Sequence, residues 1–573
     1  MIQSACGLDC YDACAIVASS GKLKGGEDRF TSRVLCSVLN RHIAKASRIM
    51  QPTIEGVEVT MEVALEALSK VLDKDSLLYR GSGNVGVMQE VTHLLFNRLS
   101  ATIANGSLCD GAGEAGIAQG RGVNRLLTPQ HIGKAEVIVV WGRNIDTTNT
   151  HLLPYLKGKK LVVIDPIQTA IAKQADVHLQ IAPRSDLYLA LLLCRFVIMQ
   201  DMQKVSEFDG IEDFYDFTRT FRIKLLLERT DLKADNIAKV VELLGYEKVV
   251  HLVGVGVQKY SIGDAVLRAI DALAVILGHY GKEGCGVSFL GNSKLSFNNP
   301  FAIQTQTISK VNTPFGRFKS VLIQGANPAH SMPDTNRVIK ELKKVENLIY
   351  FGTYHNETSQ LAKIVIPALN FLEKSDVRLS YSDYSIKAMN PITQANHGIS
   401  EYAFTRILIE KLGSGEIDDE RSYIDSWLTQ ATHGVSLAAK NMLRFETFEF
   451  LEEIDDDFEA IKNLTDIKNL KNTHNTSGYW LLTPKAKHAI NSQFKRDNSV
   501  EIHCDLGFHE GEKITLTTLY GTLNGIVKIN NGVRQDCVMV RANVTGVNRL
   551  TPSIVSNKGN SACFQETKVT LTK

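Results

Sequence analysis

The chain has 573 residues, of which 44% are hydrophobic, so several domains with large buried cores are expected. Its 64 lysines and arginines nearly balance its 62 aspartates and glutamates, which argues against a nucleic-acid binder and against an acidic partner-binding tail. No apolar run is long enough to cross a bilayer and the start, Met1-Ile-Gln-Ser, has no export leader, so we expect a cytoplasmic protein without membrane insertion.

Three cysteines at four-residue spacing open the chain, Cys6, Cys10 and Cys14, and Cys36 follows after a predicted hairpin over 15–30. Four thiolates that converge on one point suit a [4Fe-4S] cluster, in which each iron takes one cysteine. Structural zinc is the rival, but it favours cysteines paired at two-residue separation. A disulfide set is disfavoured without a secretion signal, and four unrelated buried cysteines are the remaining alternative.

The next segment predicts a strand, a glycine-rich turn and a helix. Apolar residues at helical spacing indicate a helix over 59–72, and a short strand over 77–80 follows it. That strand ends in Gly81-Ser-Gly-Asn-Val-Gly86, before a predicted helix over 88–99. The arrangement is a candidate phosphate cradle, although glycines at such a corner can also serve turn geometry alone.

Cys109 lies in a second glycine-rich stretch, Gly106 to Gly116. The surrounding glycines predict an exposed thiol, and a helix that starts just after it would favour the thiolate. Such a sulfur can be a nucleophile or a metal ligand. The alternative is a small residue in a tight turn.

Buried-strand runs at 137–140 and 161–164 end in Trp141-Gly-Arg-Asn144 and in Asp165-Pro166. Alternating strands and helices predict a parallel, doubly wound sheet that binds ligands at the carboxyl ends of its strands. Asp165, at the end of the second strand, is well placed to bind sugar hydroxyls.

The same corner recurs later, where Val321-Leu-Ile-Gln-Gly325-Ala-Asn327-Pro328 repeats the strand-Gly-x-Asn pattern of 139–144. Each copy is followed by a threonine-containing segment and a proline-ended strand, at 165–176 and 179–183 in the first copy and at 353–363 and 364–367 in the second. Two nucleotide-type half-sites are predicted, for two similar ligands or for one ligand with pseudo-twofold symmetry. Coincidence of two α/β units is the alternative.

The rest of the chain predicts one more strand, a peripheral region and a barrel. A strand over 249–257 ends in Gly254-Val-Gly256 and precedes a long helix over 267–277. Acidic clusters within 412–477 indicate peripheral helices and then a linker. After Tyr479, short alternating strands with Asn-Gly corners predict a compact β-barrel.

In this order the motifs resemble the molybdopterin oxidoreductase family, which is typified by dimethyl sulfoxide reductase and by molybdenum or tungsten formate dehydrogenases. The cysteine set resembles the family's N-terminal [4Fe-4S] site, and the stretch around Cys109 resembles the segment that carries the metal ligand. The resemblance covers almost the whole chain, and its further motifs are Trp141-Gly-Arg-Asn144 with Asn149 and His151, Gly325-Ala-Asn-Pro328, Phe371-Leu-Glu373, Thr483-Pro-Lys485 with Asn491-Ser-Gln-Phe494, and Asn548-Arg-Leu with Ala562-Cys563.

The resemblance implies an α/β fold with four domains. These are a [4Fe-4S] domain over 1–50, a discontinuous α/β cofactor-binding domain over 51–125 and 314–474, a second one over 126–313, and a molybdopterin dinucleotide-binding β-barrel over 475–573. It also implies a bis(molybdopterin guanine dinucleotide) cofactor with Mo or W, with Cys109 as the protein's ligand to the metal. The cofactor contacts that it implies are Gly142, Asn144, Asp165, Asp186, Gly325, Asn327, Pro328, Glu357, Thr358, Lys485, Asn491 and Asn548.

The function implied is a two-electron conversion of a small molecule, with electrons passed through the cluster to a redox partner protein. Asp110 would donate or accept a proton beside the metal, and a turn-capping aspartate is the alternative. Two other functions fit the same fold: non-redox hydration or hydroxyl transfer on the same cofactor, and a cofactor-free structural subunit of a respiratory complex. The retained Cys109 and the full cysteine set argue against the structural subunit.

Three positions depart from the family pattern. Val38 stands where the family usually has a lysine, two residues after the fourth cysteine, so electron transfer is expected either to be tuned differently or to be less important. Asp110 stands where formate dehydrogenases have histidine, which weakens a formate assignment, and Lys363 stands where the repeat usually has aspartate. The chain is also short for the family, so a trimmed substrate funnel is expected.

Overall fold

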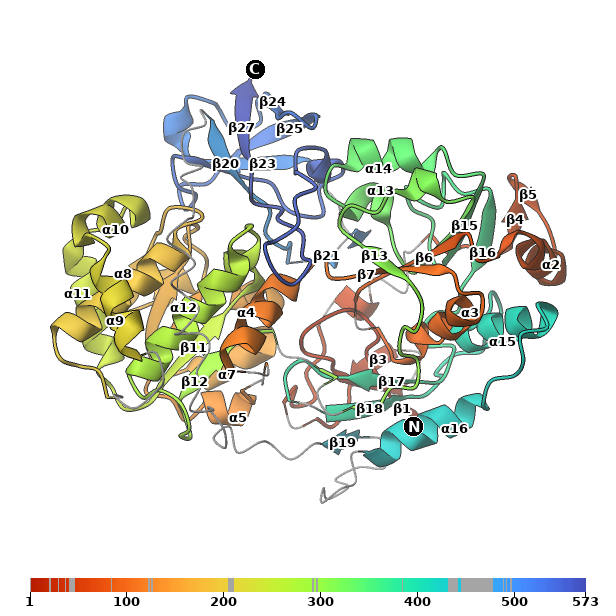
Figure 1. Ribbon diagram of the computed structural model, residues 1–573, viewed down its shortest axis with the longest axis horizontal. Coiled ribbons are helices and arrows are strands. Elements are labelled where there is room, and N and C mark those ends of the chain that lie inside the picture. Colours follow the sequence, from red (N-terminus) through yellow and green to blue (C-terminus); the bar gives the residue numbers. More distant parts are fainter. Residues whose placement is uncertain are drawn as a thin grey trace. The chain divides into compact units, whose positions relative to one another are not determined.

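Each of the chain's two units is built around a mostly parallel β-sheet. The computed structural model describes residues 2–573 apart from 20–21, 29, 37, 41–46, 84, 122–123, 125–126, 205–210, 291–292, 295–296, 384, 431–441, 445–477, 488, 491 and 495–496. Unit 1 comprises 1–106, 293–446 and 488–496, and unit 2 comprises 107–292, 447–487 and 497–573 (Figure 1). The division into four domains stays a prediction.

The sheet of unit 2 has the strand order β10-β9-β8-β11-β12, and all its pairs are parallel. Its strands are β8 (Val137–Trp141), β9 (Lys160–Ile164), β10 (Val177–Leu179), β11 (Val249–Val253) and β12 (Gly286–Ser288). Every residue of β8 and β11 is buried, as expected for parallel strands covered on both faces. The predicted doubly wound arrangement is therefore confirmed for this part of the chain.

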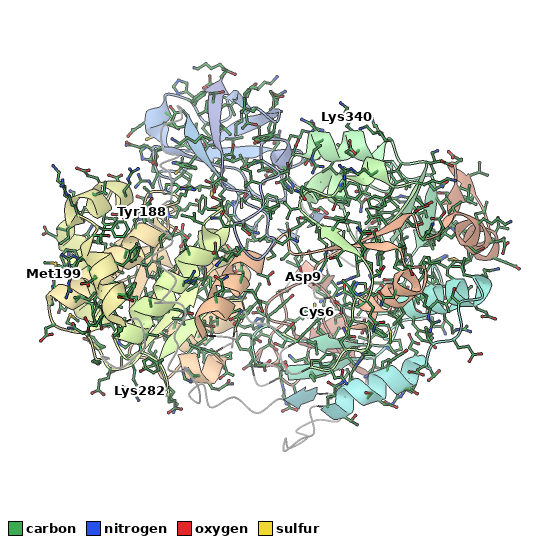
Figure 2. All side chains as sticks on the ribbon, in the orientation of Figure 1. Cys6, Asp9, Tyr188, Met199, Lys282 and Lys340 are labelled. Carbon is green, nitrogen blue, oxygen red and sulfur yellow. The ribbon has the colours of Figure 1, made fainter. Side chains whose placement is uncertain are left out.

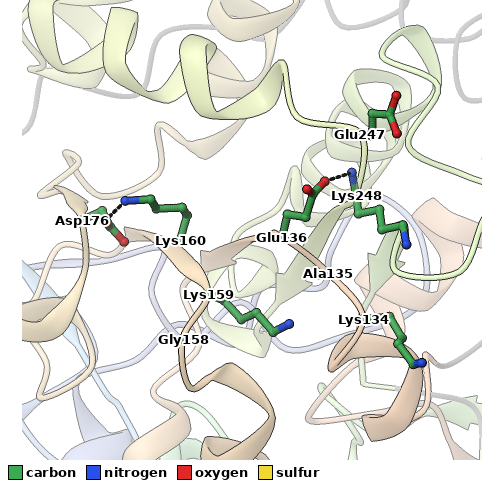
Figure 3. A pocket seen from close by; sticks show the side chains of 9 residues that line it. All are labelled: Lys134, Ala135, Glu136, Gly158, Lys159, Lys160, Asp176, Glu247 and Lys248. Atoms are coloured by element: carbon green, nitrogen blue, oxygen red, sulfur yellow. Dashed lines mark hydrogen bonds and ion pairs between the residues drawn. The ribbon is translucent and has the colours of Figure 1, made fainter.

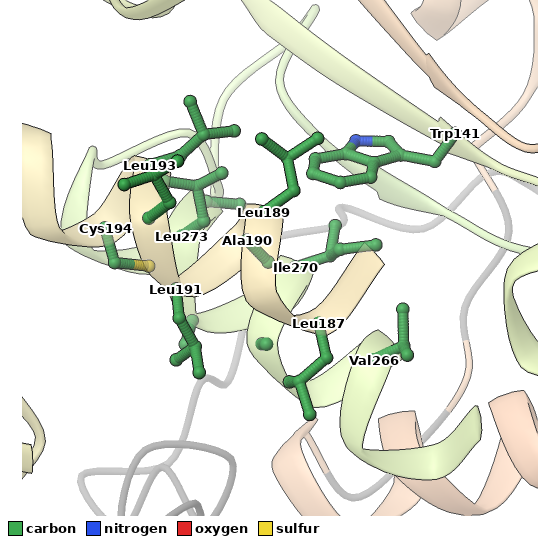
Figure 4. Packing of buried hydrophobic residues seen from close by; sticks show 14 of the residues in the cluster. Trp141, Leu187, Leu189, Ala190, Leu191, Leu193, Cys194, Val266, Ile270 and Leu273 are labelled. Atoms are coloured by element: carbon green, nitrogen blue, oxygen red, sulfur yellow. The ribbon is translucent and has the colours of Figure 1, made fainter. Parts of the chain in front are cut away.

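Three helices form the core that carries this sheet, α4 (Gly111–Arg121), α8 (Asp186–Met199) and α12 (Gly263–Ile276). All fourteen residues of α12 are buried, because α4 and α8 both pack on it. Figure 4 shows Leu189 of α8 and Ile270 of α12 beside the Trp141 ring of β8, and Leu187 further along α8 in the same cluster. The remaining helices of the unit are α5 (Pro129–Ile132), α6 (Ile145–Thr148), α7 (Leu153–Leu156), α9 (Ile211–Arg219), α10 (Ile223–Thr230) and α11 (Ala234–Leu244), with 3₁₀ turns η2 (Thr150–Leu152), η3 (Ala172–Gln174) and η4 (Val255–Gln258).

A closed barrel of six strands ends unit 2, with the order β20-β26-β23-β25-β24-β27. Its interior holds alternate apolar residues such as Ile514, Leu516 and Val527, which is the period-two pattern that the sequence predicted. The elements are β20 (Tyr479–Leu482), β23 (Ser499–Ile502), β24 (Lys513–Thr517), β25 (Thr522–Ile529), β26 (Cys537–Met539), β27 (Lys568–Thr572), η7 (Cys504–Leu506) and η8 (Val547–Arg549).

The sheet of unit 1 has the order β13-β7-β6-β14-β15-β16-β4-β5, with antiparallel pairing only at its β4–β5 edge. The strands are β4 (Thr53–Ile54), β5 (Val57–Glu58), β6 (Ser76–Arg80), β7 (Thr102–Asn105), β13 (Thr307–Ser309), β14 (Ser320–Gln324), β15 (Asn347–Gly352) and β16 (Ile364–Pro367). Its helical elements are α2 (Met61–Val71), η1 (Met88–Glu90), α3 (Thr92–Arg98), η5 (Phe315–Arg317), α13 (Pro328–Ser331), α14 (Thr335–Leu342), α15 (Glu401–Lys411) and α16 (Glu420–Gln430).

Small antiparallel sheets complete unit 1 and form around the first cysteines. The hairpin predicted over 15–30 is present as β2 (Ala15–Ser19) and β3 (Lys22–Gly25), with β1 (Ile2–Ala5) added to it. A second sheet contains β17 (Asp376–Leu379), β18 (Ser385–Met389) and β19 (Met442–Arg444), and β21 (Ala489–Ile490) pairs with β22 (Gln493–Phe494).

The sequence repeat corresponds to a repeat in the fold. The parallel series β10-β9-β8-β11-β12 of unit 2 matches β16-β15-β14-β6-β7 of unit 1 strand by strand, with β8 and β14 at equivalent places. In both series the Gly-x-Asn corner follows the central strand. The two Gly-x-Asn corners of the sequence thus stand at equivalent places in two parallel sheets.

Some predicted bounds were wrong for local reasons. The strand expected over 179–183 ends at Leu179, where the Ile181 N–H turns back to the Leu179 carbonyl at 2.9 Å. The strand expected over 249–257 ends at Val253, because the glycine corner turns the chain into η4.

The expected linker within 412–477 lies largely outside the described residues. None of the described helices combines the length and apolar character needed to span a bilayer.

Candidate metal and cofactor sites

Cys109 lies in a turn between β7 and α4 that is held by its own polar groups. The Ser107 hydroxyl accepts the N–H groups of Cys109 at 2.9 Å and Asp110 at 3.1 Å, and donates to the Asp110 carboxylate at 2.6 Å. Short side chains of this kind stabilise turns by bonding to nearby backbone. The turn fixes the backbone of Cys109, whose thiol is partly exposed.

Gln258 and Lys259, at the end of η4 and just after it, hold this turn in place. The sequence did not single out either residue. The Lys259 ammonium donates to the carbonyls of Leu108 at 2.5 Å and Cys109 at 2.7 Å, and lies 5.1 Å from the centre of the Phe564 ring. The Gln258 amide also donates to the Cys109 carbonyl, and its oxygen accepts the Gly113 N–H at 2.9 Å. A signal was present, because Gln258 and Lys259 lie two and three residues after the predicted Gly254-Val-Gly256 corner.

Glycines bring the Cys109 turn and α4 close to their neighbours in unit 2. A Cβ on Gly111 would collide with the Gly559 carbonyl of the barrel, and one on Gly116 would collide with the Asp264 backbone of α12. A Cβ on Gly113 would lie 2.5 Å from the Phe289 ring. The glycine-rich stretch therefore serves close packing of the helix that follows Cys109.

Glu114 lies one helical turn after Asp110, and its carboxyl is partly buried. Burial first, and then the charge of Asp110, raises the pKa of Glu114 from 4.5 to about 7. Near neutral pH this group therefore exchanges a proton readily. Among the described residues, Glu114 is the only acidic residue of α4, and its pKa is raised in this way.

The corner after β8 has the geometry of a tight strand-to-helix turn. Gly142 has φ +51°, and its N–H donates to the Ile164 carbonyl of β9 at 2.8 Å. Gly254, at the end of β11, approaches the Gly142 carbonyl so closely that no side chain fits there. Among the described residues, the buried Oδ1 atom of Asn144 has no hydrogen-bond partner.

Asp165 and Asp186 form a buried carboxyl pair beside this corner, at the end of β9 and the start of α8. Burial raises the pKa of each to about 7, and the charge of Asp165 further raises that of Asp186. Among the described residues, no lysine or arginine contributes to the pKa of either carboxyl. Two buried acceptors of this kind match the N–H donors of a guanine edge.

Unit 1 repeats the corner after β14. Gly325 has φ +55°, and its N–H donates to the Phe351 carbonyl of β15 at 2.9 Å. The Asn327 amide donates to the Glu357 carboxylate at 2.8 Å, and its oxygen accepts the Thr358 hydroxyl at 2.9 Å. Pro328 begins α13 next to this network. Four implied contacts, Gly325, Asn327, Glu357 and Thr358, are thus joined in one corner.

The four N-terminal cysteines act on one another electrostatically. Burial raises the pKa of Cys6 to about 11, with a further contribution from Cys36, and it also raises the pKa values of Cys10 and Cys14, to which neighbouring thiols contribute. Cys6 and Cys14 are buried and Cys36 is exposed. Figure 2 labels Cys6 with Asp9 of the same loop. The donor set is four soft thiols in one loop region of unit 1.

A single zinc ion is the rival of a cluster at these four cysteines. Among the described residues, the only group with three such ligand atoms within 4.8 Å of one another is His503, Cys504 and Asp505, and the four N-terminal cysteines do not form one. A tetrahedral zinc with Zn–S bonds of about 2.3 Å would require sulfurs about 3.8 Å apart. A [4Fe-4S] cluster takes one cysteine on each iron, and four cysteines match that donor set.

A hollow at the amino ends of β8, β9 and β11 lies at the opposite edge of the sheet from Gly142 (Figure 3). Its charges balance one another in part: Lys160 pairs with Asp176 at 3.2 Å, and the Lys248 N–H donates to Glu136 at 3.1 Å. The lining residues are Lys134, Ala135, Glu136, Gly158, Lys159, Lys160, Asp176, Glu247 and Lys248. We therefore treat it as a solvated surface and not as part of the cofactor site.

The remaining implied contacts lie in unit 2 or outside the described residues. Lys485 is exposed, and its charge lowers the pKa of Lys259 after the larger effect of burial. Asn548 is buried in η8, where its carbonyl accepts the Thr551 hydroxyl at 3.2 Å. Asn491 lies outside the described residues.

Comparison with known proteins agrees with this arrangement. The family model described as molybdopterin oxidoreductase matches residues 64–398. A probable oxidoreductase, YyaE, of Bacillus subtilis is 26% identical over 465 residues, which are 72% of this chain and 69% of that protein. The F420-dependent formate dehydrogenase subunit alpha of Methanocaldococcus jannaschii is 24% identical over 485 residues, 72% of this chain and 70% of that protein.

The fold is shared with a solved structure, acetylene hydratase from Pelobacter acetylenicus. The TM-score is 0.81 at 13% sequence identity, and the match covers 100% of both chains. The family model spans more than half of the chain, and the related sequences are oxidoreductases. The chain is therefore an enzyme that belongs to the molybdopterin oxidoreductase family.

Proposed function

We propose that this enzyme is an oxidoreductase with a bis(molybdopterin guanine dinucleotide) cofactor carrying Mo or W. Membership of the family implies a Mo or W pterin cofactor. The guanine dinucleotide form of the cofactor is supported by the repeated corner, in which Gly142 has φ +51° and Gly325 has φ +55° at equivalent strand ends. Two matching corners suit a cofactor made of two similar halves.

Unit 2 would hold one half of the cofactor at the Gly142 corner. The unpartnered Oδ1 of Asn144 and the buried carboxyls of Asp165 and Asp186 supply acceptors for the amino and N–H groups of guanine. Unit 1 would hold the other half at the Gly325 corner, with Asn327, Pro328, Glu357 and Thr358. Lys485, Asn491 and Asn548 are proposed as further contacts.

Cys109 would provide the protein's ligand to the metal, because a thiolate suits a soft, sulfur-rich coordination sphere. When bound, the cofactor supplies a two-electron redox centre for a small-molecule substrate. The turn at Ser107, Gln258 and Lys259 holds the Cys109 backbone in one position. Asp110 and Glu114 are proposed to hold and move protons beside it, and Glu114 is suited to this by its pKa of about 7.

One [4Fe-4S] cluster on Cys6, Cys10, Cys14 and Cys36 is proposed to carry electrons to a partner protein. The set of four thiols and their electrostatic effects on one another support this proposal. Relatives named as an alpha subunit and as a catalytic subunit support a partner chain. Non-redox hydration is the alternative function, and Val38 is compatible with it. The likeness to acetylene hydratase at 13% identity concerns the fold alone.

Anaerobic purification of the full chain tests the proposal. We expect about four irons for each chain, one Mo or W, and guanine nucleotide released by hydrolysis at two for each metal ion. A dye-linked assay over a panel of small molecules separates redox turnover from hydration. Release of adenine dinucleotide or flavin, or zinc in place of iron, would contradict the proposal.

A further inference from the structure

Arg378 of β17 is a fully buried cation beneath the first cysteine loop of unit 1, with 0% of its surface exposed. Its guanidinium donates to main-chain carbonyls of that loop, to Cys10 at 2.9 Å, to Cys6 at 3.3 Å and to Leu8 at 3.4 Å. The fourth contact is the Tyr381 ring, whose centre lies 5.8 Å from the guanidinium carbon. Arg378 thus shapes the backbone that carries two of the four cysteines.

Among the residues that the structure describes, no carboxylate forms an ion pair with Arg378 to balance its charge, and its Nη1 atom is buried without a hydrogen-bond partner. Neutral carbonyls solvate a cation only in part, and burying an uncompensated charge is costly. An anionic group bound beside Arg378 would remove that cost.

A neighbouring cation provides the contrast. Lys387 faces Arg378 directly across the β17–β18 pair and is also buried. Its ammonium donates to the Ala13 carbonyl at 2.9 Å and pairs with the Asp28 carboxylate. The charge of Lys387 is therefore compensated by Asp28, whereas no carboxylate of the described part of the chain forms an ion pair with Arg378.

We propose that Arg378 is the counter-charge and positioning residue of the iron–sulfur cluster, and that its buried cation raises the cluster's reduction potential. The inference rests on the proposed cluster at Cys6, Cys10, Cys14 and Cys36. A [4Fe-4S] cluster with four thiolates is anionic and gains a further negative charge on reduction. A fixed cation in a low-dielectric interior stabilises the reduced form more than the oxidised form. This supplies a positive charge in a chain that has Val38 at the family's usual lysine position.

The test compares Arg378→Met with Arg378→Lys in the full chain purified anaerobically. Both variants lose the guanidinium fork, and they differ from each other mainly by one charge. Iron content is measured first, and the cluster's midpoint potential is then followed by EPR during reductive titration. We expect the Met variant to keep iron with a lowered potential, and the Lys variant to titrate close to the wild type. Lys387→Met combined with Asp28→Asn is the control, because it removes a neutral pair, and its potential should stay close to the wild type.

The outcomes separate this inference from the proposed function. A wild-type chain without iron contradicts the proposed cluster itself. A Met variant with full iron and an unchanged potential overturns the role of Arg378, as does a control that shifts as far as the Met variant. If Arg378→Met loses iron, Arg378→Gln, which keeps an amide donor without charge, replaces it in the titration. Loss of iron in both neutral variants but not in Arg378→Lys supports the inference, and equal loss in all three overturns it.

Discussion

Gly142 and Gly325 occupy the same left-handed conformation at equivalent places in two sheets. Their φ angles are +51° and +55°, and each N–H donates to a carbonyl at the carboxyl end of the next strand, at 2.8 Å and 2.9 Å. The carbonyl of each of these two glycines is also approached closely by another glycine, Gly254 beside Gly142 and Gly81 beside Gly325. The conformation follows from glycine itself, because a Cβ disfavours positive φ. The repeat seen in the sequence is therefore a repeat of backbone geometry.

This relationship predicts unequal costs for the same substitution. Gly325→Ala should cost about 1–2 kcal/mol of stability through backbone strain alone, because among the described residues no atom lies within 4 Å of the new Cβ. Gly142→Ala should cost more, because its Cβ would also lie 2.7 Å from the Val257 side chain. Thermal unfolding of the cofactor-free variants measures the difference. Equal melting temperatures would contradict the crowding at Gly142.

Asp165→Asn should make the cofactor-free protein more stable at alkaline pH. Burial raises the pKa of Asp165 from 3.8 to about 7, so the folded state binds a proton that the unfolded state has released. The stability that Asp165 contributes is thus present below about pH 4 and is lost as the pH rises through about 7. The variant lacks this dependence, so its advantage at pH 8 should vanish near pH 4. Guanine content should fall in the loaded enzyme, because one acceptor is altered.

Asp176→Asn serves as the control with the opposite sign. A hydrogen bond from the Leu161 N–H, together with Lys160, lowers the pKa of Asp176. Its contribution to stability is present above the unfolded pKa and is lost as the pH falls. Urea unfolding between pH 4 and pH 8 should therefore show Asp176→Asn less stable than the wild type at neutral pH. The same trend for both variants would contradict the raised pKa of Asp165.

Cys109→Ala should keep iron and guanine but lose most turnover, with an altered Mo or W spectrum. The hydrogen bonds of the turn involve the backbone of Cys109, so they survive the loss of its thiol. Serine is expected to restore a little activity, since oxygen can also be a ligand. Cys194→Ala in the core of α8 is the control, and it should lower the melting temperature without changing the metal spectrum. Full activity in Cys109→Ala would identify Cys109 as a turn residue.

Sequence reasoning succeeded where a signal is local. The buried runs of β8 and β9, the corners at Gly142 and Gly325 and the alternation in the barrel all depend on neighbours in the sequence. Arg378 was missed because it contacts Cys6 and Cys10 across more than 360 residues, a pairing that no periodicity encodes. Which polar residues are buried also depends on the assembled fold. The partners of long-range contacts were therefore the part that could not be predicted.

Lys259→Met should loosen the Cys109 turn without unfolding the protein. The ammonium of Lys259 bonds to two carbonyls, of Leu108 at 2.5 Å and Cys109 at 2.7 Å. Methionine keeps the contact with the Phe564 ring but offers no donor, so the Leu108 carbonyl loses this bond, whereas that of Cys109 keeps the bond from the Gln258 amide. Each hydrogen bond to a charged group contributes a net stabilisation of about 1.5–3 kcal/mol, so the turn should open more often in the variant. Backbone amides of 107–110 should then exchange hydrogen faster by roughly ten-fold or more, and turnover should fall at unchanged iron content.

Lys568→Met, at a lysine 5.0 Å from the Trp480 ring in the barrel, is the matched control and should leave exchange at 107–110 unchanged. Unaltered exchange in Lys259→Met would show that Ser107 and Gln258 alone hold Cys109.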